Sequence, residues 1–395
     1  MAEPHSSVTV QRDAKGFDLY QAIGGRTACR ELAASFYARV ERHPVLRLLF
    51  PGKTLTCAIE EFAAFLAQFL GGPSQDAKRR WWLSLYESHL RFKISQNERD
   101  AWMDTMVAAL DDMRLDPPIR SALQSFFEQS SSYLVNQGPA QAGNDRNDCL
   151  GNCIHQEISR RWDAQRDLDE AVAAIRNLNT ERVIGLCESP GLRARFIADR
   201  SVFAALLALM IKSGDAVLIG YAQRRLQDDP AIARGWYGGR TLLHDACGVG
   251  NLATVELLLR LDADPNAGDH SPLYCVGNQC SLPTGADVVH ALVERGANVN
   301  VRNGVKQCTA LHMAARRGNV MIAEALLDCG AEIEARDTLG DTALRRSVNC
   351  NHPEVAALLV SWGADVHSKG NKGLTPLSAA RTDEMRRVLR SDGHR

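Results

Sequence analysis

A single histidine, His89, stands in the stretch LYESHLRFKISQNERDAW, residues 85–102, where apolar residues recur at helical spacing. A neutral imidazole nitrogen is a good ligand for a transition metal, so a histidine held on a helix face could carry a metal centre. A histidine in such a place is also common without any special role, packed in a core or left at the surface. The sequence patterns around His89 are needed to choose between these interpretations.

The cysteines are a second candidate for metal chemistry. Cys149 and Cys153, with His155 nearby, would share one helix face, but no second pair of ligands follows them. The 11 cysteines are an odd number and are scattered through helical patterns, which favours reduced thiols over a disulfide framework. We therefore expect no metal at these cysteines and a cytoplasmic location.

Composition and charge limit the possible partners. The chain has 395 residues, of which 45% are hydrophobic and 24% charged, as is typical of a globular protein of two or three domains. A formal net charge of -1 argues against nucleic acid and membrane surfaces as partners. We also expect no membrane span, since no run of about 18 apolar residues occurs, and no secretory signal, since no apolar segment follows the start.

Helical segments with aromatic faces surround His89. Residues 29–40 and 59–73 each place apolar side chains at i, i+3, i+4 and i+7, and the second segment ends at two glycines and a proline. Ser95, followed by Glu98, predicts a capping box at the start of a further helix, which carries Trp102. Because several aromatic faces converge, these segments predict a small all-helical domain.

The C-terminal half of the chain repeats itself. Residues 241–269, 309–337 and 342–370 share one pattern that begins TLLH, TALH and TALR, and the later copies start 33 residues apart at Thr309 and Thr342. Each unit reads as a short helix, a tight turn and a second helix with an apolar face. One unit cannot bury that face alone, so the pattern predicts a solenoid of stacked helix pairs.

This pattern resembles the ankyrin repeat. Most copies have a glycine where the second helix ends, a position that favours a left-handed backbone: Gly296, Gly330 and Gly363. Asp262 takes that place in the first copy and should tolerate the backbone less well. The resemblance implies that His244 and His312 bond backbone groups between repeats, and that a partner protein binds the concave face.

Motifs of the N-terminal part resemble the group II truncated haemoglobins in their order and spacing. They span about residues 17–137 and read FDLYQAIGG, SFYARVERHPVLRLLFPG, FLAQFLGGP, SHLRFKIS, ERDAWM and YLVN. The resemblance implies an all-α globin domain that holds haem b and its iron. The chain departs from the family at HLRF, where HAPF is common, and at Leu70, where a tryptophan often stands.

The resemblance also implies roles for single residues. His89 falls on the proximal histidine that ligates the haem iron. Tyr37 and Trp102 fall on the distal residues that donate hydrogen bonds to the bound diatomic ligand. The apolar residues expected around the haem are Phe50, Phe62, Leu66, Phe69 and Phe92. Four basic residues are candidates to pair with the haem propionates, of which one or two are expected to do so: Arg79, Arg80, Arg91 and Lys93.

These patterns predict an all-α fold, a truncated globin followed by an ankyrin solenoid with degenerate first repeats. In the degenerate part, Gly214 aligns with Gly250 of the first clear repeat. The expected segments are an N-terminal tail (1–16), a haem globin (17–138), a linker and connecting helix (139–164), degenerate capping repeats (165–238) and ankyrin repeats (239–395).

The expected function is reversible binding of oxygen or another diatomic gas, such as nitric oxide or carbon monoxide, in a bacterial-type cytoplasmic protein. The repeats would couple the globin to an unknown partner protein, which makes a gas or redox sensor one interpretation. Two alternatives stay open. One is a haem-dependent oxidoreductase acting on nitric oxide or peroxide and tethered by the repeats, and the other is an ankyrin scaffold whose globin fold holds no haem.

Overall fold

The structure, a computed structural model, is all-α as predicted. The described part of the chain contains no β-strand, and its β-structure is limited to two isolated β-bridges, Tyr237–Arg240 and Asn303–Cys308. No helix among the described residues combines the length and the apolar character that a bilayer crossing requires. The structure describes residues 18–50, 54–72, 84–137, 153–371 and 373–390.

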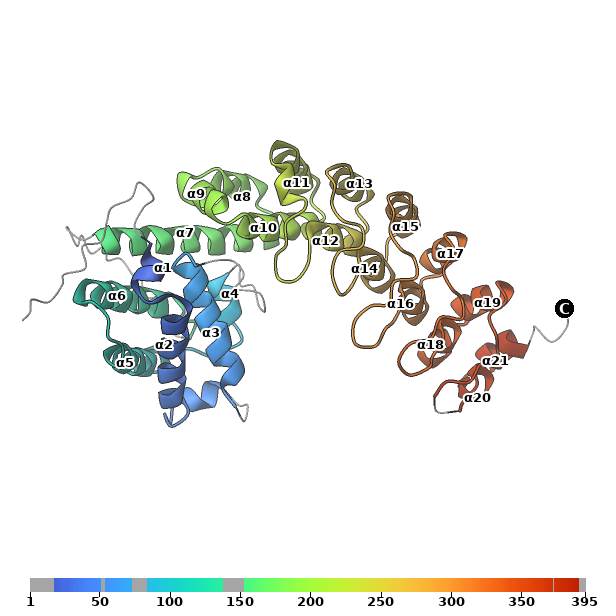
Figure 1. Ribbon diagram of the computed structural model, residues 1–395, viewed down its shortest axis with the longest axis horizontal. Coiled ribbons are helices and arrows are strands. Elements are labelled where there is room, and N and C mark those ends of the chain that lie inside the picture. The colour runs from blue at the N-terminus through green and yellow to red at the C-terminus, as the bar shows by residue number, and fades with distance from the viewer. Residues whose placement is uncertain (1–17, 51–53, 73–83, 138–152, 372, 391–395) are drawn as a thin grey trace, which may run out of the picture. The chain divides into compact units, whose positions relative to one another are not determined.

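The chain divides into two compact units (Figure 1). The first unit comprises Met1–Ala171 and Glu188–Arg195, and the second comprises Val172–Cys187 and Phe196–Arg395. The elements of the first unit are α1 (Leu19–Ala22), α2 (Gly25–Val40), the 3-10 helix η1 (Leu46–Leu49), α3 (Thr56–Phe69), α4 (Leu85–His89), α5 (Gln96–Asp111), α6 (Pro117–Tyr133) and most of α7 (Cys153–Arg176).

Local signals in the sequence set the ends of the helices that matter for the site. Helix α5 begins at the predicted capping box, because Ser95 and Glu98 bond each other's backbone groups. Helix α3 stops at Phe69, and Gly71 follows with φ of 91°, a left-handed conformation that suits glycine. Both sequence predictions are confirmed, and they fix where Trp102 and the aromatic face of α3 stand.

Helix α7 adds to the core of the first unit. Ile158 and Trp162 are buried in the same cluster as the globin-like helices α2 to α6. The Trp162 ring packs on Phe126 and Tyr133, with centroids 5.7 and 5.5 Å apart. Arg161 donates a hydrogen bond from Nη1 to the carbonyl oxygen of Phe69 at 3.0 Å. The core of this unit therefore includes a helix that follows α6 in the chain.

The second unit stacks helix pairs in two rows (Figure 1). The first helices of the repeats, α12, α14, α16 and α18, pack in succession, and so do the second helices, α13, α15, α17 and α19.

The helices of the second unit have the following bounds: α8 (Thr180–Cys187), α9 (Pro190–Ala198, which begins in the first unit), α10 (Arg200–Ser213), α11 (Ala216–Asp228), η3 (Pro230–Ile232), α12 (Leu242–Val249), α13 (Leu252–Arg260), α14 (Pro272–Gln279), α15 (Gly285–Glu294), α16 (Ala310–Arg317), α17 (Val320–Asp328), α18 (Ala343–Cys350), α19 (Pro353–Ser361), α20 (Pro376–Ala379) and α21 (Asp383–Arg390).

The left-handed positions predicted from the repeats are confirmed. Gly296, Gly330 and Gly363 have φ of 89°, 85° and 90°, and Asp262 has φ of 60° at the equivalent place. Upstream, α10 and α11 form a further helix pair that packs on α12 and α13. Its turn holds Gly214 at φ of 74°, close to the 73° of Gly250.

A histidine joins neighbouring repeats, as the resemblance implied. His312 Nδ1 accepts a hydrogen bond from the backbone N–H of Thr309 at 3.2 Å, and Nε2 donates to the carbonyl oxygen of Asp341 in the next repeat at 3.0 Å. Burial lowers the pKa of His312 below its ordinary 6.5, which keeps the imidazole neutral. In the next copy, Arg345 takes this place and donates to the carbonyl oxygen of Leu374 at 2.7 Å.

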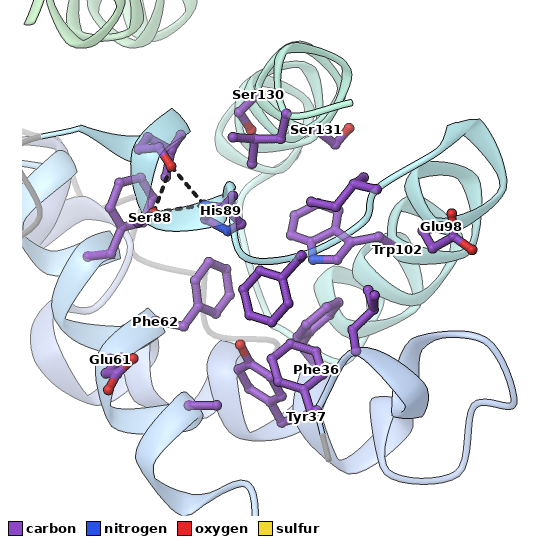
Figure 2. A pocket seen from close by; sticks show the side chains of 18 of the residues that line it. Phe36, Tyr37, Glu61, Phe62, Ser88, His89, Glu98, Trp102, Ser130 and Ser131 are labelled. Carbon is purple, nitrogen blue, oxygen red and sulfur yellow. Dashed lines mark hydrogen bonds between the residues drawn. The ribbon is translucent and has the colours of Figure 1, made fainter. Parts of the chain in front are cut away.

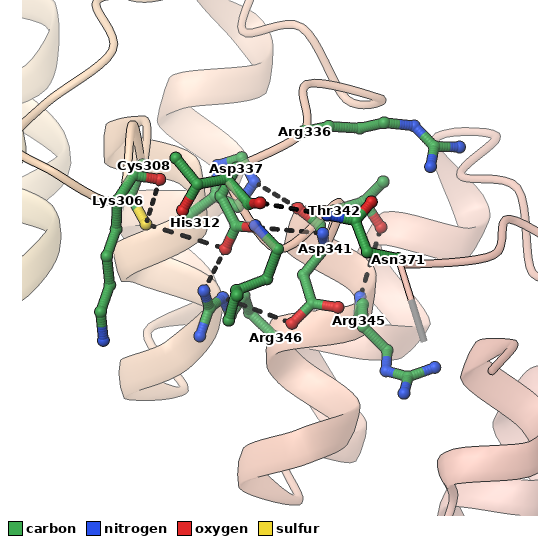
Figure 3. Close-up of polar contacts among 12 residues, drawn as sticks. Lys306, Cys308, His312, Arg336, Asp337, Asp341, Thr342, Arg345, Arg346 and Asn371 are labelled. Atoms are coloured by element: carbon green, nitrogen blue, oxygen red, sulfur yellow. Dashed lines mark hydrogen bonds and ion pairs between the residues drawn. The ribbon is translucent and has the colours of Figure 1, made fainter. Parts of the chain in front are cut away.

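An ion pair supports the same loops (Figure 3). Asp337 accepts hydrogen bonds from the backbone N–H groups of Leu339 and Asp341 at 2.8 and 3.1 Å, and it pairs with the guanidinium of Arg346. Burial works against the charge of Asp337, but the hydrogen bonds, above all that from Arg346, hold its pKa below the ordinary 3.8. The carboxylate of Asp337 therefore has hydrogen-bond partners both in the loop and on the first helix of the next repeat.

Candidate functional site

A cavity of about 860 Å³ lies within the first unit, between helices α2 to α6 (Figure 2). Sites for small molecules and cofactors commonly measure roughly 300–1,000 Å³. The wall is rich in aromatic side chains, and it also carries polar and charged ones, among them Glu61, Arg91 and Lys93. Six of the eight expected site residues line the cavity: Tyr37, Phe50, Phe62, His89, Phe92 and Trp102.

The other two expected residues lie in the core instead of lining the cavity. Leu66 and Phe69 are 1% and 3% exposed. Phe69 is seven residues beyond Phe62, about 10 Å along the helix, and it stacks on Phe126 with centroids 4.1 Å apart. Because Phe126 itself lines the cavity, Phe69 supports the wall from behind.

Several wall residues were not among the expected site residues. Phe65 belongs to the same helix stripe as Phe62, and the two rings are stacked at 6.5 Å. Helical periodicity could have placed Phe65 on the same helix face as Phe62. Glu61 also lines the cavity, but periodicity gives no reason to place a carboxylate there.

The hydrogen bonds of His89 fix its neutral tautomer. Nδ1 lies 2.8 Å from the carbonyl oxygen of Leu85 and 2.8 Å from Oγ of Ser88 (Figure 2). A carbonyl oxygen can only accept, so Nδ1 carries the proton and Nε2 keeps its lone pair. Burial lowers the pKa of His89 below its ordinary 6.5, which favours this neutral form. A half-buried imidazole of this kind on a cavity wall can ligate a metal through Nε2.

Tyr37 and Trp102 bring hydrogen-bond donors to the same cavity (Figure 2). Burial, together with the negative charge of Glu61, raises the pKa of Tyr37 well above its ordinary 10, so the hydroxyl keeps its proton. The Trp102 ring packs on Phe36 and Phe127, with centroids 5.2 and 5.7 Å apart. The two donors can stabilise a partly negative ligand inside an apolar space.

Basic side chains also reach the cavity. Arg91 and Lys93 line it, and the Arg91 guanidinium lies 4.7 Å from the centroid of the Phe92 ring. These cations could pair with the carboxylates of a ligand that is otherwise apolar. The other two expected cations, Arg79 and Arg80, lie outside the described residues.

This fold and cavity define a globin-type domain joined to a repeat domain, and the family comparisons agree. Residues 18–134 match the family described as bacterial-like globin. Residues 238–270 match the ankyrin repeat, and residues 278–370 match a family of three ankyrin repeat copies.

Relatives of known name give the more specific assignment. Group 2 truncated hemoglobin YjbI of Bacillus subtilis is 35% identical over 122 residues, which are 31% of this chain and 91% of that protein. The N-terminal part of the chain therefore belongs to the group 2 truncated haemoglobins. The prediction of a truncated globin fused to ankyrin repeats is confirmed.

The repeats have relatives of other kinds. Human ankyrin repeat and SOCS box protein 16 is 34% identical over 154 residues, or 36% of this chain and 33% of that protein. The transient receptor potential channel pyrexia of Drosophila melanogaster is 33% identical over 205 residues, or 48% of this chain and 20% of that protein. The chain spans a third or less of these relatives, so the likeness is confined to their repeats.

The residues present fit the haem that this family implies. The cavity is rich in aromatic side chains, His89 offers one nitrogen lone pair, and Arg91 and Lys93 could supply cations for two propionates. Imidazole is a common axial ligand of haem iron, and the polarity of the pocket controls ligand binding. The donors Tyr37 and Trp102 line the same cavity as His89.

Proposed function

We propose that the first unit binds haem b through His89 and reversibly holds a diatomic gas, such as oxygen, nitric oxide or carbon monoxide. The observation that carries this proposal is the hydrogen bonding and the position of His89. Its Nδ1 proton is donated to the carbonyl oxygen of Leu85, and its ring lines a cavity large enough for a cofactor. Haem, when bound, would supply an iron centre that takes a diatomic ligand.

The apolar and the polar side chains of the cavity would then have different roles. Phe50, Phe62 and Phe92 exclude water, which strengthens every electrostatic contact inside. Tyr37 and Trp102 donate hydrogen bonds to a gas molecule that gains partial negative charge on binding. These roles favour slow release of the gas, and hence storage or sensing at low concentration.

The test of haem binding is ultraviolet–visible spectroscopy of the full chain in ferric, ferrous, oxygen-exposed and carbon-monoxide-exposed states. We expect a Soret band in each state, and its loss or a marked shift in His89→Ala. His155→Ala is the matched control, because among the described residues the one hydrogen bond of that half-exposed histidine of α7 is with Ser121, at 3.5 Å, and its spectra should stay those of the parent.

Two outcomes would favour the alternatives. Parent protein that shows no Soret band after incubation with haem, and whose absorbance the His89→Ala change leaves unaltered, would favour a scaffold whose globin fold holds no haem. Many turnovers of nitric oxide or peroxide with a reductant would favour an oxidoreductase. Very slow re-reduction of the iron would count against that enzyme.

We also propose that the second unit binds a partner protein on its concave face. Exposed apolar side chains recur in the loops before the first helices of the repeats, and such patches often mark interaction sites. They are Trp236 (50% exposed), Val305 (95%), Leu339 (49%) and Leu374 (44%). Proteins captured by the parent chain should be lost when Trp236, Val305 and Leu339 are changed to serine, and kept in Val217→Ser, which alters an exposed residue of α11.

A sensor role would require the gas to alter partner binding, and the presence of both modules on one chain supports this proposal. We expect the affinity for the captured partner to differ between ligand-free, gas-bound and haem-free protein. Equal affinities in the three states would contradict it.

We propose the bacterial cytoplasm as the location, on the basis of the scattered, odd-numbered cysteines.

A further inference from the structure

Asp169 of helix α7 bonds the short helix that carries His89. Its Oδ1 accepts a hydrogen bond from the backbone N–H of Leu85 at 2.9 Å, and its Oδ2 accepts one from that of Tyr86 at 3.1 Å. These are the first two N–H groups of α4, which the helix cannot satisfy itself. Asp169 is 3% exposed and belongs to the first unit, but it lies beyond the residues 18–134 that match the globin family.

One peptide group connects this carboxylate to His89. The carbonyl of Leu85 and the N–H of Tyr86 belong to the same peptide unit. Its N–H donates to Asp169, and its oxygen accepts the proton of His89 Nδ1 at 2.8 Å. Hydrogen bonds in a chain polarise one another in a low-dielectric interior. The charge of Asp169 therefore makes the Leu85 oxygen a stronger acceptor and increases the electron density on the imidazole.

The hydrogen-bond partners of Asp169 suit the ionised carboxylate. Besides Leu85 and Tyr86, Gln165 donates from Nε2 at 3.0 Å, and the Tyr133 hydroxyl also bonds the carboxyl group. Burial raises the pKa of Asp169 above its ordinary 3.8, and the bonds from these donors act against that rise. All four partners act as donors, which a carboxylate satisfies and a protonated carboxyl group satisfies less well.

We propose that Asp169 is a positioning residue for the proximal ligand, which orients α4 and strengthens His89 as an electron donor to haem iron. The proposal rests on the proposed haem binding by His89. Groups that bond the second nitrogen of a ligating histidine raise its basicity and tune the metal. Here that influence comes from a carboxylate one peptide group away, on a helix outside the matched globin residues.

The test compares Asp169→Asn with the parent chain, both loaded with haem. Asparagine keeps the size but loses the charge, so the iron–histidine stretching frequency of the ferrous protein, read by resonance Raman, should fall. The ferric–ferrous reduction potential should rise, because a weaker donor stabilises the ferric state less. Asp163→Asn is the matched control, since Asp163 lies on the same helix and, among the described residues, forms its ion pair with Arg166 at the surface. It should match the parent in both measurements.

A second variant separates electronic tuning from simple support of the fold. Tyr133→Phe keeps the ring that packs on Trp162 and removes one of the donors that share the charge of Asp169. The carboxylate then acts more strongly on the Tyr86 N–H, so the stretching frequency should rise, opposite to Asp169→Asn. A purely structural contact would not produce shifts of opposite sign.

Three results would overturn the proposal, and they are distinguishable. If the parent shows a Soret band but the stretching frequency and potential of Asp169→Asn equal those of Asp163→Asn, Asp169 does not tune His89. If the parent takes up no haem, the proposed function fails and this inference fails with it. Hydrogen exchange of the Leu85 and Tyr86 amides in haem-free protein gives a readout without haem: it should be faster in Asp169→Asn, and an unchanged rate would refute the contact.

Discussion

The ring of Tyr37 stands edge-on to the ring of Phe50, with the centroids 5.5 Å apart and the planes at 89°. Phe36 packs edge-on to the same tyrosine at 5.1 Å. Two perpendicular aromatic contacts restrict the rotation of the phenol. Among the described residues none accepts a hydrogen bond from its hydroxyl, which is thus available to a ligand in the cavity.

Tyr37→Phe should speed the release of the gas. The change keeps the aromatic packing and removes one donor, and a hydrogen bond lost in a dry pocket costs about 1–3 kcal/mol, or about 5- to 150-fold in rate. Oxygen dissociation followed by stopped flow measures the effect. Tyr274→Phe, which alters a tyrosine of the repeats, should leave the rate unchanged. A rate for Tyr37→Phe equal to that of the parent would contradict the donor role.

Trp162→Ala should destabilise the first unit strongly, although Trp162 lies outside the matched globin residues. The side chain is 4% exposed and packs on Phe126 and Tyr133. Removing a buried tryptophan typically costs about 3–5 kcal/mol. Urea unfolding of the full chain, followed by the absorbance of bound haem, reports this unit. Trp236→Ala, at a half-exposed site of the second unit, serves as the control and should leave the transition of the first unit unchanged.

Asp262→Gly should stabilise the second unit. Asp262 adopts φ of 60°, where glycine has no side-chain penalty. Its ion pair with Arg234 is long, at 3.8 Å, and exposed, so losing it costs little. We expect a gain of about 0.5–1 kcal/mol in urea unfolding followed by circular dichroism. The reverse change at an equivalent place, Gly296→Asp, should cost a similar amount; a gain there would show that the left-handed backbone is not the cause.

Mild acid should weaken the repeats through His244 and His312. Burial lowers both pKa values below the ordinary 6.5, so the unfolded chain binds protons more tightly than the folded chain. The stabilisation is fully present above pH 6.5 and is lost as pH falls from there through the lowered folded pKa values.

The measurement is the urea midpoint of the second unit between pH 7.5 and 5. The carboxylate of Asp337 does not interfere in this range, because its pKa is lowered from an already acidic 3.8. A His244→Gln/His312→Gln double variant should be less stable at pH 7.5 and should show a smaller fall with acid. A fall as large as that of the parent would assign the effect to other groups.

Local patterns predicted much of the fold. The helices and turns inside each repeat, the capping box at Ser95 and the left-handed positions each depend on residues that are close together in the sequence. The pattern that predicts them can therefore be read from one sequence. The stripe that includes Phe62 and Phe69 was visible as a helix face. Periodicity gives the face but not the height along the helix at which a cavity begins, so it could not separate the wall residue Phe62 from Phe69 behind Phe126.

The contacts of α7 had no such signal. Asp169 and Leu85 are 84 residues apart, and a buried aspartate on a helix looks like any solvated charge in a linear pattern. Trp162 likewise meets Phe126 only in three dimensions. Long-range contacts of this kind depend on how the helices pack, which neither helical spacing nor the truncated globin motifs encode.

Because α7 contributes to the globin core, it limits where recombination can join a globin domain of this kind to a repeat domain. A recombination event that cut at the end of the matched globin residues, near position 134, would leave Ile158, Trp162 and Asp169 with the other parent. The inherited globin would lack part of its core and the carboxylate that bonds the helix of its proximal histidine. The part of the chain that must be inherited together is therefore longer than the residues that match the globin family, and a viable crossover should fall after residue 195, where the last segment of the first unit ends.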